Sequence, residues 1–367
     1  MRIAHVVTYI SPDGAFGGPV RVALGQAAAL AEQGHNVTVF AASPDNTPQT
    51  IDTDGYQIRT FPARRIHRGL GFAGMFAPGL TKSLRRDLAQ LDIVHVHLAR
   101  DLVTLPAARA ARKSNVRLIV QPHGMIDRSQ NPLAAPIDAW EVKSALAEAH
   151  AVLTLTDRES RDIQQIAPTA RVERIANGIR IADLPSYDER AGGVVFLARL
   201  HQRKRPGAFV EMAAKLVHRG VAADFILAGP DEGEADQVLA LIRASEADKR
   251  IRWIGPVDPS ETDALLREAR VFVLPSIGEV FPMSILEAFA AGTPVVTTSS
   301  LGIASKCRDY GAAVVTDGTV DALSDAVSEI LSSSHLSSEL RAGARRFLEA
   351  ELSIDAVADH LVKLYEE

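Results

Sequence analysis

The chain has 367 residues, 47% of them hydrophobic and 23% charged, which is typical of a globular protein with room for two α/β domains. Its net charge of −5 argues against a dedicated nucleic-acid binder, and its single cysteine, Cys307, excludes an internal disulfide framework. The apolar stretch at residues 3–10 is too short for a signal peptide, and no stretch approaches the ~20 apolar residues of a spanning helix. These features predict a cytoplasmic protein.

Short β-branched runs alternate with longer amphipathic stretches, the pattern of parallel-sheet α/β domains. In the first half the predicted strands are 3–8, 37–42, 56–61, 92–97, 116–122, 151–156 and 172–175, with a helix at 19–33. Residues 178–192 lose this periodicity and gain Asp, Pro, Ser and paired Gly, which is typical of a linker.

The second half repeats the same rhythm, which predicts a second doubly wound domain. Its predicted strands are 194–200, 223–228, 251–254, 271–275, 294–298 and 313–315. Its predicted helices are 206–219, 234–244, 259–269, 284–290 and 320–332, with two more after Leu336. Ligands of such domains bind at the carboxyl ends of the strands.

A glycine-bearing loop follows the first predicted strand and ends in Gly17, Gly18 and Pro19, just before a helix. Adjacent glycines let backbone N–H groups approach a ligand, and a helix N-terminus favours a phosphate. An ordinary flexible turn explains these residues equally well. The G-x-G-x-x-G spacing is absent, and the second strand ends at Ser43 without an acid to hold a ribose, so NAD binding is not expected.

A histidine, His123, precedes Gly124 at the end of a predicted strand. A neutral imidazole there can accept a proton or hydrogen-bond a sugar hydroxyl. The alternative is a loop histidine that bonds to local backbone. His5, His95 and His97 are interpreted as strand-end or packing residues.

Two cations, Arg199 and Lys204, follow the first strand of the second half. Cations at a strand-to-helix junction are well placed to neutralise a diphosphate leaving group. A solvated basic loop is the alternative, and the neighbouring Arg203 and Arg205 are assigned to it.

Two carboxylates, Glu279 and Glu287, lie eight residues apart, one in a loop after a strand and one in the predicted first turn of a helix. Each can accept hydrogen bonds from vicinal hydroxyls, and backbone amides around residues 281–284 can bind an anion at the helix N-terminus. Ser284-x-x-Glu287 also matches a capping box, in which Glu287 only satisfies the Ser284 backbone N–H. The spacing alone does not separate these two interpretations.

The triplet Asp52–Thr53–Asp54 matches the metal-binding D-x-D of other nucleotide-sugar enzymes. No further ligand cluster accompanies it, and aspartate is common in turns because it hydrogen-bonds its own backbone. It is interpreted as a solvated turn, and no metal site is predicted.

The ordered set of motifs resembles the GT-B glycosyltransferases of the large retaining family 4, over nearly the whole chain. The resemblance rests on the glycine loop, residues 122–125, residues 175–179, Arg199 with Lys204, and above all an E-x7-E signature at Glu279 and Glu287. It departs at Ala198, where a glycine is expected, and at residues 280–283, which lack the family's glycine.

The resemblance implies an α/β GT-B fold with two facing Rossmann-like domains and an interdomain cleft. Residues 1–180 would form the acceptor-side domain, 181–192 the linker and 193–350 the nucleotide-sugar-binding domain. Residues 351–367 would form a helix that returns to the first domain.

The resemblance also implies an activity: metal-independent, cofactor-free retaining transfer of a hexose-type sugar from a nucleoside-diphosphate sugar to a glycan or lipid-linked acceptor, in bacterial polysaccharide or glycolipid synthesis. The implied catalytic residues are His123, Glu279, Arg199 and Lys204. The implied donor-binding residues are Gly17, Gly18, Phe281, Met283, Ser284 and Glu287. A nucleotide-sugar 2-epimerase and a non-catalytic nucleotide-sugar-binding subunit are the alternatives.

A basic and apolar segment at residues 64–76 is a candidate for the acceptor side. It contains Arg64, Arg65, His67, Arg68, Leu70, Phe72, Met75 and Phe76. Such a segment can rest on the anionic inner face of the cell membrane, where a lipid-linked acceptor would lie. The alternative is the core of an acceptor loop with solvated arginines.

Overall fold

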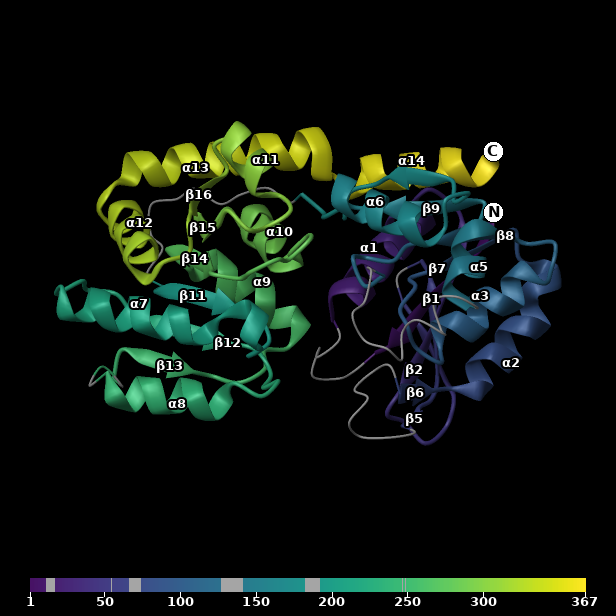
Figure 1. The fold of residues 1–367 in the computed structure, drawn as a ribbon, viewed down its shortest axis with the longest axis horizontal. Helices are drawn as coiled ribbons and strands as arrows, with labels where there is room; N and C mark the ends of the chain where they lie inside the picture. The colour runs from purple at the N-terminus through teal and green to yellow at the C-terminus, as the bar shows by residue number, and fades with distance from the viewer. Residues whose placement is uncertain are drawn as a thin grey trace. The chain divides into compact units, whose positions relative to one another are not determined.

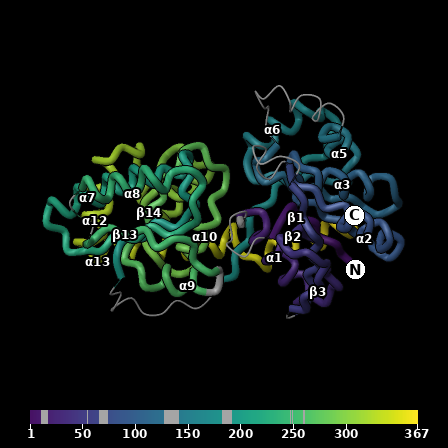
Figure 2. The backbone as a smooth tube through the Cα atoms, turned by 90° about the horizontal axis from the view of Figure 1, so that it is seen from below, coloured from purple at the N-terminus to yellow at the C-terminus, as the bar shows by residue number. Residues whose placement is uncertain are grey.

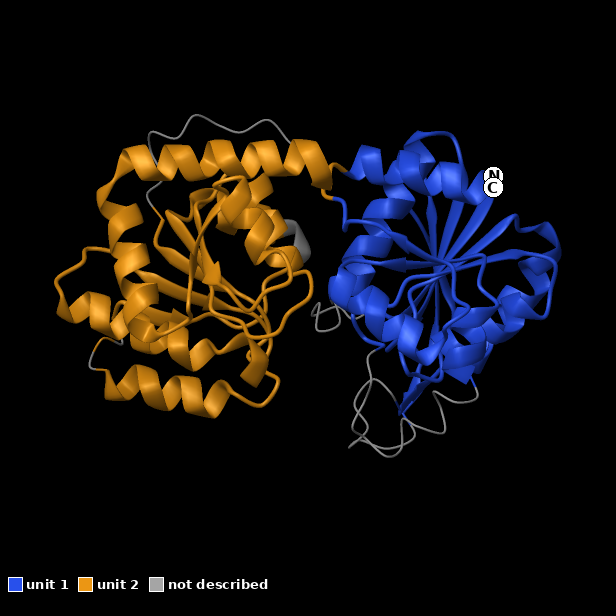
Figure 3. Ribbon diagram, turned by 45° about the horizontal axis from the view of Figure 1, so that its top comes forward, with its two compact units in different colours: residues 1–12, 16–178, 354–367 blue, residues 13–15, 179–353 orange. Residues whose placement is uncertain are grey.

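The computed structural model describes residues 1–10, 17–53, 55–65, 74–126, 141–181, 192–245, 247 and 249–367. These form two compact units (Figure 3). Unit 1 comprises the described residues up to Gly178 together with Ile354–Glu367, and unit 2 comprises those of Ile179–Ser353. The last helix therefore belongs to unit 1. The loop residues 11–16, Asp54, residues 66–73 and linker residues 182–191 lie outside the described residues.

Unit 1 is built on an eight-stranded sheet in the order β10-β9-β8-β7-β1-β2-β4-β3. Its neighbouring strands are parallel, except that β3 and β4 form an antiparallel hairpin. The strands are β1 (Arg2–Tyr9), β2 (Asn36–Ser43), β3 (Gln49–Asp52), β4 (Gln57–Pro62), β7 (Ile93–Val96), β8 (Arg117–Val120), β9 (Ala151–Thr154) and β10 (Val172–Arg174), with a separate hairpin of β5 (Arg64–Arg65) and β6 (Met75–Phe76). The sequence did not predict β3, because all four of its residues are exposed and carry no apolar alternation.

The helices of unit 1 are α1 (Gly17–Glu32), α2 (Pro78–Asp87), α3 (Thr104–Arg112), α5 (Lys143–Ala147), α6 (Asp157–Ile166) and α14 (Ile354–Glu366), with a 3₁₀ turn η2 (Leu88–Gln90). Helix α14 packs beside α1 (Figure 1). Gly178 permits the chain to meet the start of α14, because a Cβ there would lie 2.7 Å from the Cα of Ile354. The sequence predicts that the helix starts at Pro19. Helix α1 begins at Gly17 instead, so Pro19 is its third residue.

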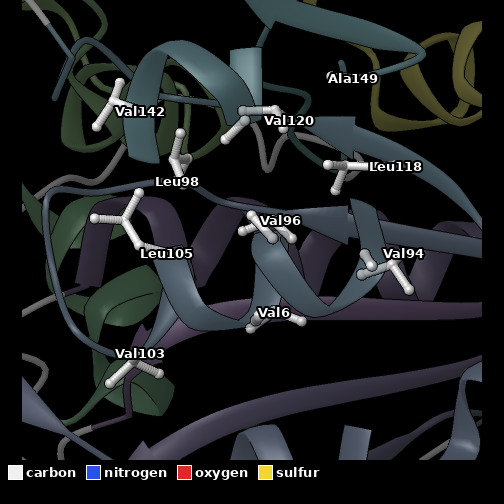
Figure 4. Close-up of a cluster of buried hydrophobic side chains, with 14 of the residues drawn as sticks. Val6, Val94, Val96, Leu98, Val103, Leu105, Leu118, Val120, Val142 and Ala149 are labelled. Carbon is white, nitrogen blue, oxygen red and sulfur yellow. The ribbon is translucent and has the colours of Figure 1, made fainter. Parts of the chain in front are cut away.

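Side chains alternate across the central strands of unit 1, and this alternation places its polar and apolar clusters. Val6, Val94 and Val96 lie in one hydrophobic cluster with the residues of α3 (Figure 4). Successive side chains of a strand point to opposite faces. His95 and its register partner His5 on β1 therefore face the other side of the sheet, where His95 contacts Tyr365 of α14.

Unit 2 is built on a six-stranded parallel sheet in the order β13-β12-β11-β14-β15-β16. Its strands are β11 (Val194–Leu197), β12 (Phe225–Ala228), β13 (Ile251–Trp253), β14 (Val271–Leu274), β15 (Val295–Thr298) and β16 (Ala313–Thr316). Its helices are η4 (Gln202–Lys204), α7 (Pro206–His218), α8 (Ala235–Ala244), α9 (Pro259–Glu268), α10 (Met283–Ala290), α11 (Ala304–Asp309), α12 (Val320–Ser332), α13 (Ser334–Phe347) and η5 (Leu348–Leu352). Helices α7 and α12 lie side by side (Figure 2). The short α11 was not predicted.

A glycine joins two strand ends at the carboxyl edge of this second sheet. Gly229 follows β12 with φ of 140°, and a Cβ there would lie 2.0 Å from the carbonyl oxygen of Ala198, just after β11. No other residue fits so close an approach. The loops that carry Arg199 and Lys204 therefore start from a fixed point.

Candidate active site

Arg199, Lys204 and Glu279 of unit 2 lie in segments that follow neighbouring strands at the carboxyl edge of its sheet. Arg199 comes after β11 and Glu279 after β14, and these two strands are hydrogen-bonded neighbours. Arg199 donates from Nη1 to the carboxylate of Glu232, which follows β12, at 2.5 Å. The predicted cations are thus brought together with carboxylates that are remote in sequence.

Lys204 and Glu279 form an ion pair in which the ammonium contacts Oε1 of the carboxylate. Both side chains are largely buried, with 15% and 21% of their surfaces exposed. Burial lowers the pKa of Lys204, although the contact with Glu279 opposes that shift. The second oxygen of Glu279, Oε2, is buried and has no hydrogen-bond partner in the described part of the chain. A buried carboxylate oxygen without a donor is costly, which points to a ligand hydroxyl as its partner.

The prediction that Arg203 and Arg205 belong to a solvated loop holds for the exposed Arg203 and is wrong for Arg205, which is partly buried. Arg205 has a left-handed backbone, with φ of 54°, and donates from Nη1 to the carbonyl of Gly318 at 2.8 Å. Arg203 is exposed, yet it donates from Nη2 to the carbonyl of Gly278 at 2.6 Å. Both arginines therefore fasten the loop of Lys204 to neighbouring loops, the loop of Glu279 among them.

The capping-box interpretation of Ser284 and Glu287 is also wrong. Helix α10 begins at Met283, its N-cap is Pro282, and no side chain caps it. Ser284 is therefore inside the helix, and Glu287 is its fifth residue rather than part of its first turn. The backbone N–H groups of Met283 and Ser284 have no acceptor among the described residues. Glu287 is half-buried on this helix and is not needed as a cap.

In unit 1, His123 follows β8 and has a left-handed backbone, with φ of 54°. Its Nε2 lies 2.7 Å from Nδ1 of His97, and Nε2 of His97 lies 3.0 Å from Nδ1 of His5. His95 instead bonds from Nδ1 to the hydroxyl of Tyr365 at 2.7 Å. His5, His95 and His97 are completely or almost completely buried. They form a polar cluster, which their interpretation as strand-end or packing residues does not include.

Burial sets the protonation of this cluster. It lowers the pKa of His5 and of His123 to about 3, and it holds those of His95 and His97 well below the usual value. All four rings are therefore neutral at pH 7. The ring nitrogens of His5, His95 and His97 lie within 4.8 Å of one another, but His97 uses both of its nitrogens in hydrogen bonds. The rings are held by hydrogen bonds to one another and to Tyr365.

Each half of the chain matches a known protein family. Residues 16–183 match the family described as Glycosyltransferase Family 4, and residues 187–347 match Glycosyl transferases group 1. The chain belongs to glycosyltransferase family 4. It is a transferase with the GT-B fold of two Rossmann-like domains.

The alignments of this glycosyltransferase with its relatives cover almost the whole of both chains. An alpha-D-kanosaminyltransferase of Streptomyces kanamyceticus is 27% identical over 92% of this chain and 96% of the relative. A D-inositol 3-phosphate glycosyltransferase of Jonesia denitrificans is 25% identical over 100% and 96%. Among solved structures, sucrose-phosphate synthase from Thermosynechococcus elongatus superposes with a TM-score of 0.79 at 18% identity, covering 100% of this chain and 98% of that one. Anabaena HepE in complex with UDP superposes with a TM-score of 0.74 at 17% identity, covering all of both chains.

One residue of the glycosyltransferase that the sequence interpretation missed supports the loop of His123. Glu159 is buried, and its two carboxylate oxygens accept from the backbone N–H of Gly124 at 2.6 Å and of Leu155 at 2.7 Å. Burial raises the pKa of this carboxyl group. The signal was present in Thr156-x-x-Glu159, a capping-box pattern, and Thr156 does accept from the Glu159 backbone N–H. The Glu159 side chain, however, binds the neighbouring loops instead of the N-cap.

The remaining predicted positions are the two glycines at the start of α1 and the Asp52–Asp54 triplet. Gly17 and Gly18 are the first two residues of α1, and a Cβ at Gly18 would meet no atom within 4 Å. Asp52 ends β3 instead of lying in a turn, and Asp54 is not described. None of the described helices has the length and apolar character that crossing a membrane requires.

Proposed function

We propose that this enzyme transfers a hexose-type sugar, with retention, from a nucleoside-diphosphate sugar to a glycan or lipid-linked acceptor. The observation that carries the donor site is the Lys204–Glu279 pair. Its ammonium suits a diphosphate, and the partnerless Oε2 of Glu279 suits a sugar hydroxyl. The solved structures of Anabaena HepE include complexes with UDP and with UDP-glucose, which supports a uridine nucleotide here.

The donor would bind along the carboxyl edge of the unit 2 sheet. Arg199 and Lys204 would stabilise the departing diphosphate, together with the N–H groups of Met283 and Ser284 at the start of α10. Phe281 would line the same loop, and Glu287 would accept from the ribose hydroxyls. Fixed charges and amides of this kind act on the charge that develops in the transition state.

The reaction would proceed by departure and attack on the same face of the sugar. The donor phosphate would take the proton of the acceptor hydroxyl, the glycosidic bond to the diphosphate would break, and the new C–O bond would form. A Cβ at Gly18 would meet no described atom within 4 Å, so packing does not explain the glycine. Gly17 and Gly18 would instead allow the donor to approach the backbone of α1. His123 would contact the donor sugar. No metal or organic cofactor is required in this proposal.

A pocket of about 360 Å³ in unit 1 supports an acceptor with an anionic headgroup and an apolar part. Phe76 and Leu102, both more than a third exposed, supply apolar surface. Lys82, Arg85 and Arg86 line the same pocket and have no carboxylate partner within the described residues. A lipid-linked acceptor at the inner face of the membrane has this chemistry. We expect the chain to sediment with vesicles containing anionic lipid and not with neutral vesicles, and equal binding to both would contradict a charge-directed contact.

Donor binding can be tested by calorimetric titration of UDP, GDP, ADP and dTDP with EDTA present throughout. We expect one nucleoside diphosphate to bind with micromolar affinity. Glu287→Gln should weaken that binding by about tenfold, the value of one charge-assisted hydrogen bond. A lower midpoint with unchanged affinity would make Glu287 structural. Binding that appears only when a divalent cation replaces EDTA would overturn metal independence.

The same preparation separates the transferase from the two alternatives. A 2-epimerase would convert the nucleotide sugar to a second nucleotide sugar with no acceptor present, and a non-catalytic subunit would leave it unchanged. We expect release of free nucleoside diphosphate that accelerates when an acceptor is supplied.

A further inference from the structure

The three hydrogen-bonded histidines of unit 1 form a single line from the interior of the sheet to its carboxyl edge. His5 lies on β1, His97 directly after β7, and His123 after β8. The sequence of contacts is His5 Nδ1 to His97 Nε2, then His97 Nδ1 to His123 Nε2. Every step uses one nitrogen of each ring, so no ring can change its proton position without affecting the next.

The rings are joined edge to edge. The ring centroids of His5 and His97 are 5.3 Å apart, and those of His97 and His123 are 5.0 Å apart. Both separations exceed the matching N···N distances by 2.3 Å, which is twice the distance from an imidazole centroid to one of its nitrogens. The planes differ by only 27° and 12°. Both hydrogen bonds therefore lie close to the line of the ring centres, near the lone-pair direction that gives the strongest bond.

A neutral imidazole carries one proton, so this line has only two arrangements. In the first, every Nδ1 carries the proton, and the buried end is the bare lone pair of His5 Nε2. In the second, every Nε2 carries the proton, and the buried end is an N–H. His5 Nε2 is buried and has no hydrogen-bond partner among the described residues. Buried N–H groups without an acceptor are the rarer defect in proteins, which favours the first arrangement.

We propose that His5 and His97 are positioning residues that fix His123 as its Nδ1–H tautomer. His123 then presents an N–H group to the sugar of the nucleotide-sugar substrate. Among the described residues, His5 Nε2 at the buried end of the line has no hydrogen-bond partner. In this tautomer Nδ1 of His123 carries the proton and Nε2 accepts from His97, so the ring has no free lone pair with which to take a proton from the acceptor. His123 acts in this arrangement by donating to a sugar oxygen and not as a general base.

This inference rests on the proposed function only for the identity of the ligand, because the tautomer can be measured on the free protein. Full-length chain labelled with ¹⁵N-histidine would be studied by long-range ¹H–¹⁵N correlation at pH 7.5. We expect His5, His97 and His123 to be neutral and protonated on Nδ1. Protonation of His123 on Nε2, a mixture of tautomers, or an imidazolium would each overturn the proposal.

A matched pair of variants separates the effect of this line of hydrogen-bonded histidines, the relay, from the effect of packing. His97→Phe removes the central link, whereas His95→Phe removes a buried ring two residues away on the same face, whose centroid lies 4.7 Å from that of His97. We expect His97→Phe alone to convert His123 to a mixture of tautomers and to weaken donor binding by roughly fivefold to tenfold, the value of one oriented hydrogen bond. Equal changes of the His123 signals in both variants would show that packing, not the relay, sets the tautomer. Should His97→Phe fail to fold, the spectrum of the unaltered protein still decides the proposal.

Addition of the nucleotide sugar tests the remaining link. A shift of the His123 Nδ1 signal on binding is expected, and its absence with the tautomer confirmed would refute the contact between His123 and the sugar while leaving the relay in place. No binding of any nucleotide sugar would instead refute the proposed function.

Discussion

Lys204→Met is expected to lower kcat by 10² to 10³ with the nucleoside-diphosphate sugar as donor, the loss found when one preorganised electrostatic group is removed from an active site. Lys204 is largely buried beside Glu279, so its charge acts in a medium less polar than water. Its loop is held at both ends, by the Gly229 contact after β11 and by the hydrogen bond from Arg205 to Gly318. The charge therefore needs no rearrangement when the diphosphate departs. Initial-rate measurements at saturating donor check this prediction.

The same substitution also leaves Glu279 as a buried carboxylate without its cation, which costs roughly 3 to 5 kcal/mol of folding stability. Lys204→Met combined with Glu279→Gln isolates the stability effect, because Glu279 is itself assigned to the donor sugar and its loss also lowers turnover. Removing both charges is expected to restore most of the stability without restoring turnover. Lys215→Met is the control, because Lys215 pairs with Asp321 on the exposed surface of the same unit and should leave kcat unchanged. Recovery of turnover in the double variant would show that Lys204 is structural.

Much of this site could be predicted because parallel strands end at a common edge. Arg199 and Glu279 each follow a short apolar run, and the runs prove to be neighbouring strands. The helices of unit 2 that carry regular apolar periodicity, such as α7 and α12, end within one residue of their predicted limits. The exposed β3 and the six-residue α11 were missed, because neither carries such a pattern.

The errors concern contacts that depend on backbone conformation or on distant partners. Arg205 looks like a surface cation in sequence, and only its left-handed backbone turns it toward the Gly318 carbonyl. Ser284 and Glu287 fit a capping box in spacing, but α10 begins two residues too early for it, with Pro282 and not Ser284 at the N-cap. Period-two alternation puts His95 and His97 on the face opposite Val94 and Val96, yet nothing local to β7 indicates that His5 and His123 join them.

Acidification from pH 7.5 to 5.5 is expected to destabilise unit 1 strongly. Four histidines of that unit, His5, His95, His97 and His123, have pKa values lowered by burial, to about 3 in the case of His5 and His123. In the unfolded chain each would bind a proton near pH 6.5. The unfolded state therefore holds more protons than the folded state between these values. Their stabilising contribution is complete above about pH 6.5 and is lost as the pH falls toward the folded pKa.

The expected slope is large because the four groups act in the same direction. Each fully unprotonated buried histidine removes up to about 1.4 kcal/mol of stability per pH unit. Asp101 and Glu159, whose pKa values are raised by burial, act in the opposite direction and offset part of this loss at lower pH. Chemical denaturation at half-unit pH steps measures the slope. Hydrogen exchange assigns it to a unit, with β1, β7 and β8 expected to lose protection before the strands of unit 2.

Removing one histidine from the linkage tests the cause. His5→Gln keeps a neutral polar side chain on β1 and carries no titrating group, so it should flatten the slope below pH 6.5 by about one proton, or roughly 1.4 kcal/mol per pH unit. His218→Gln is the control, because His218 ends α7 in unit 2 and is outside the cluster. Its slope should equal that of the unaltered chain. The buried cluster that holds His123 neutral would then also set the acid limit of the enzyme, and a slope that is flat in all three proteins would mean that the folded cluster accepts protons after all.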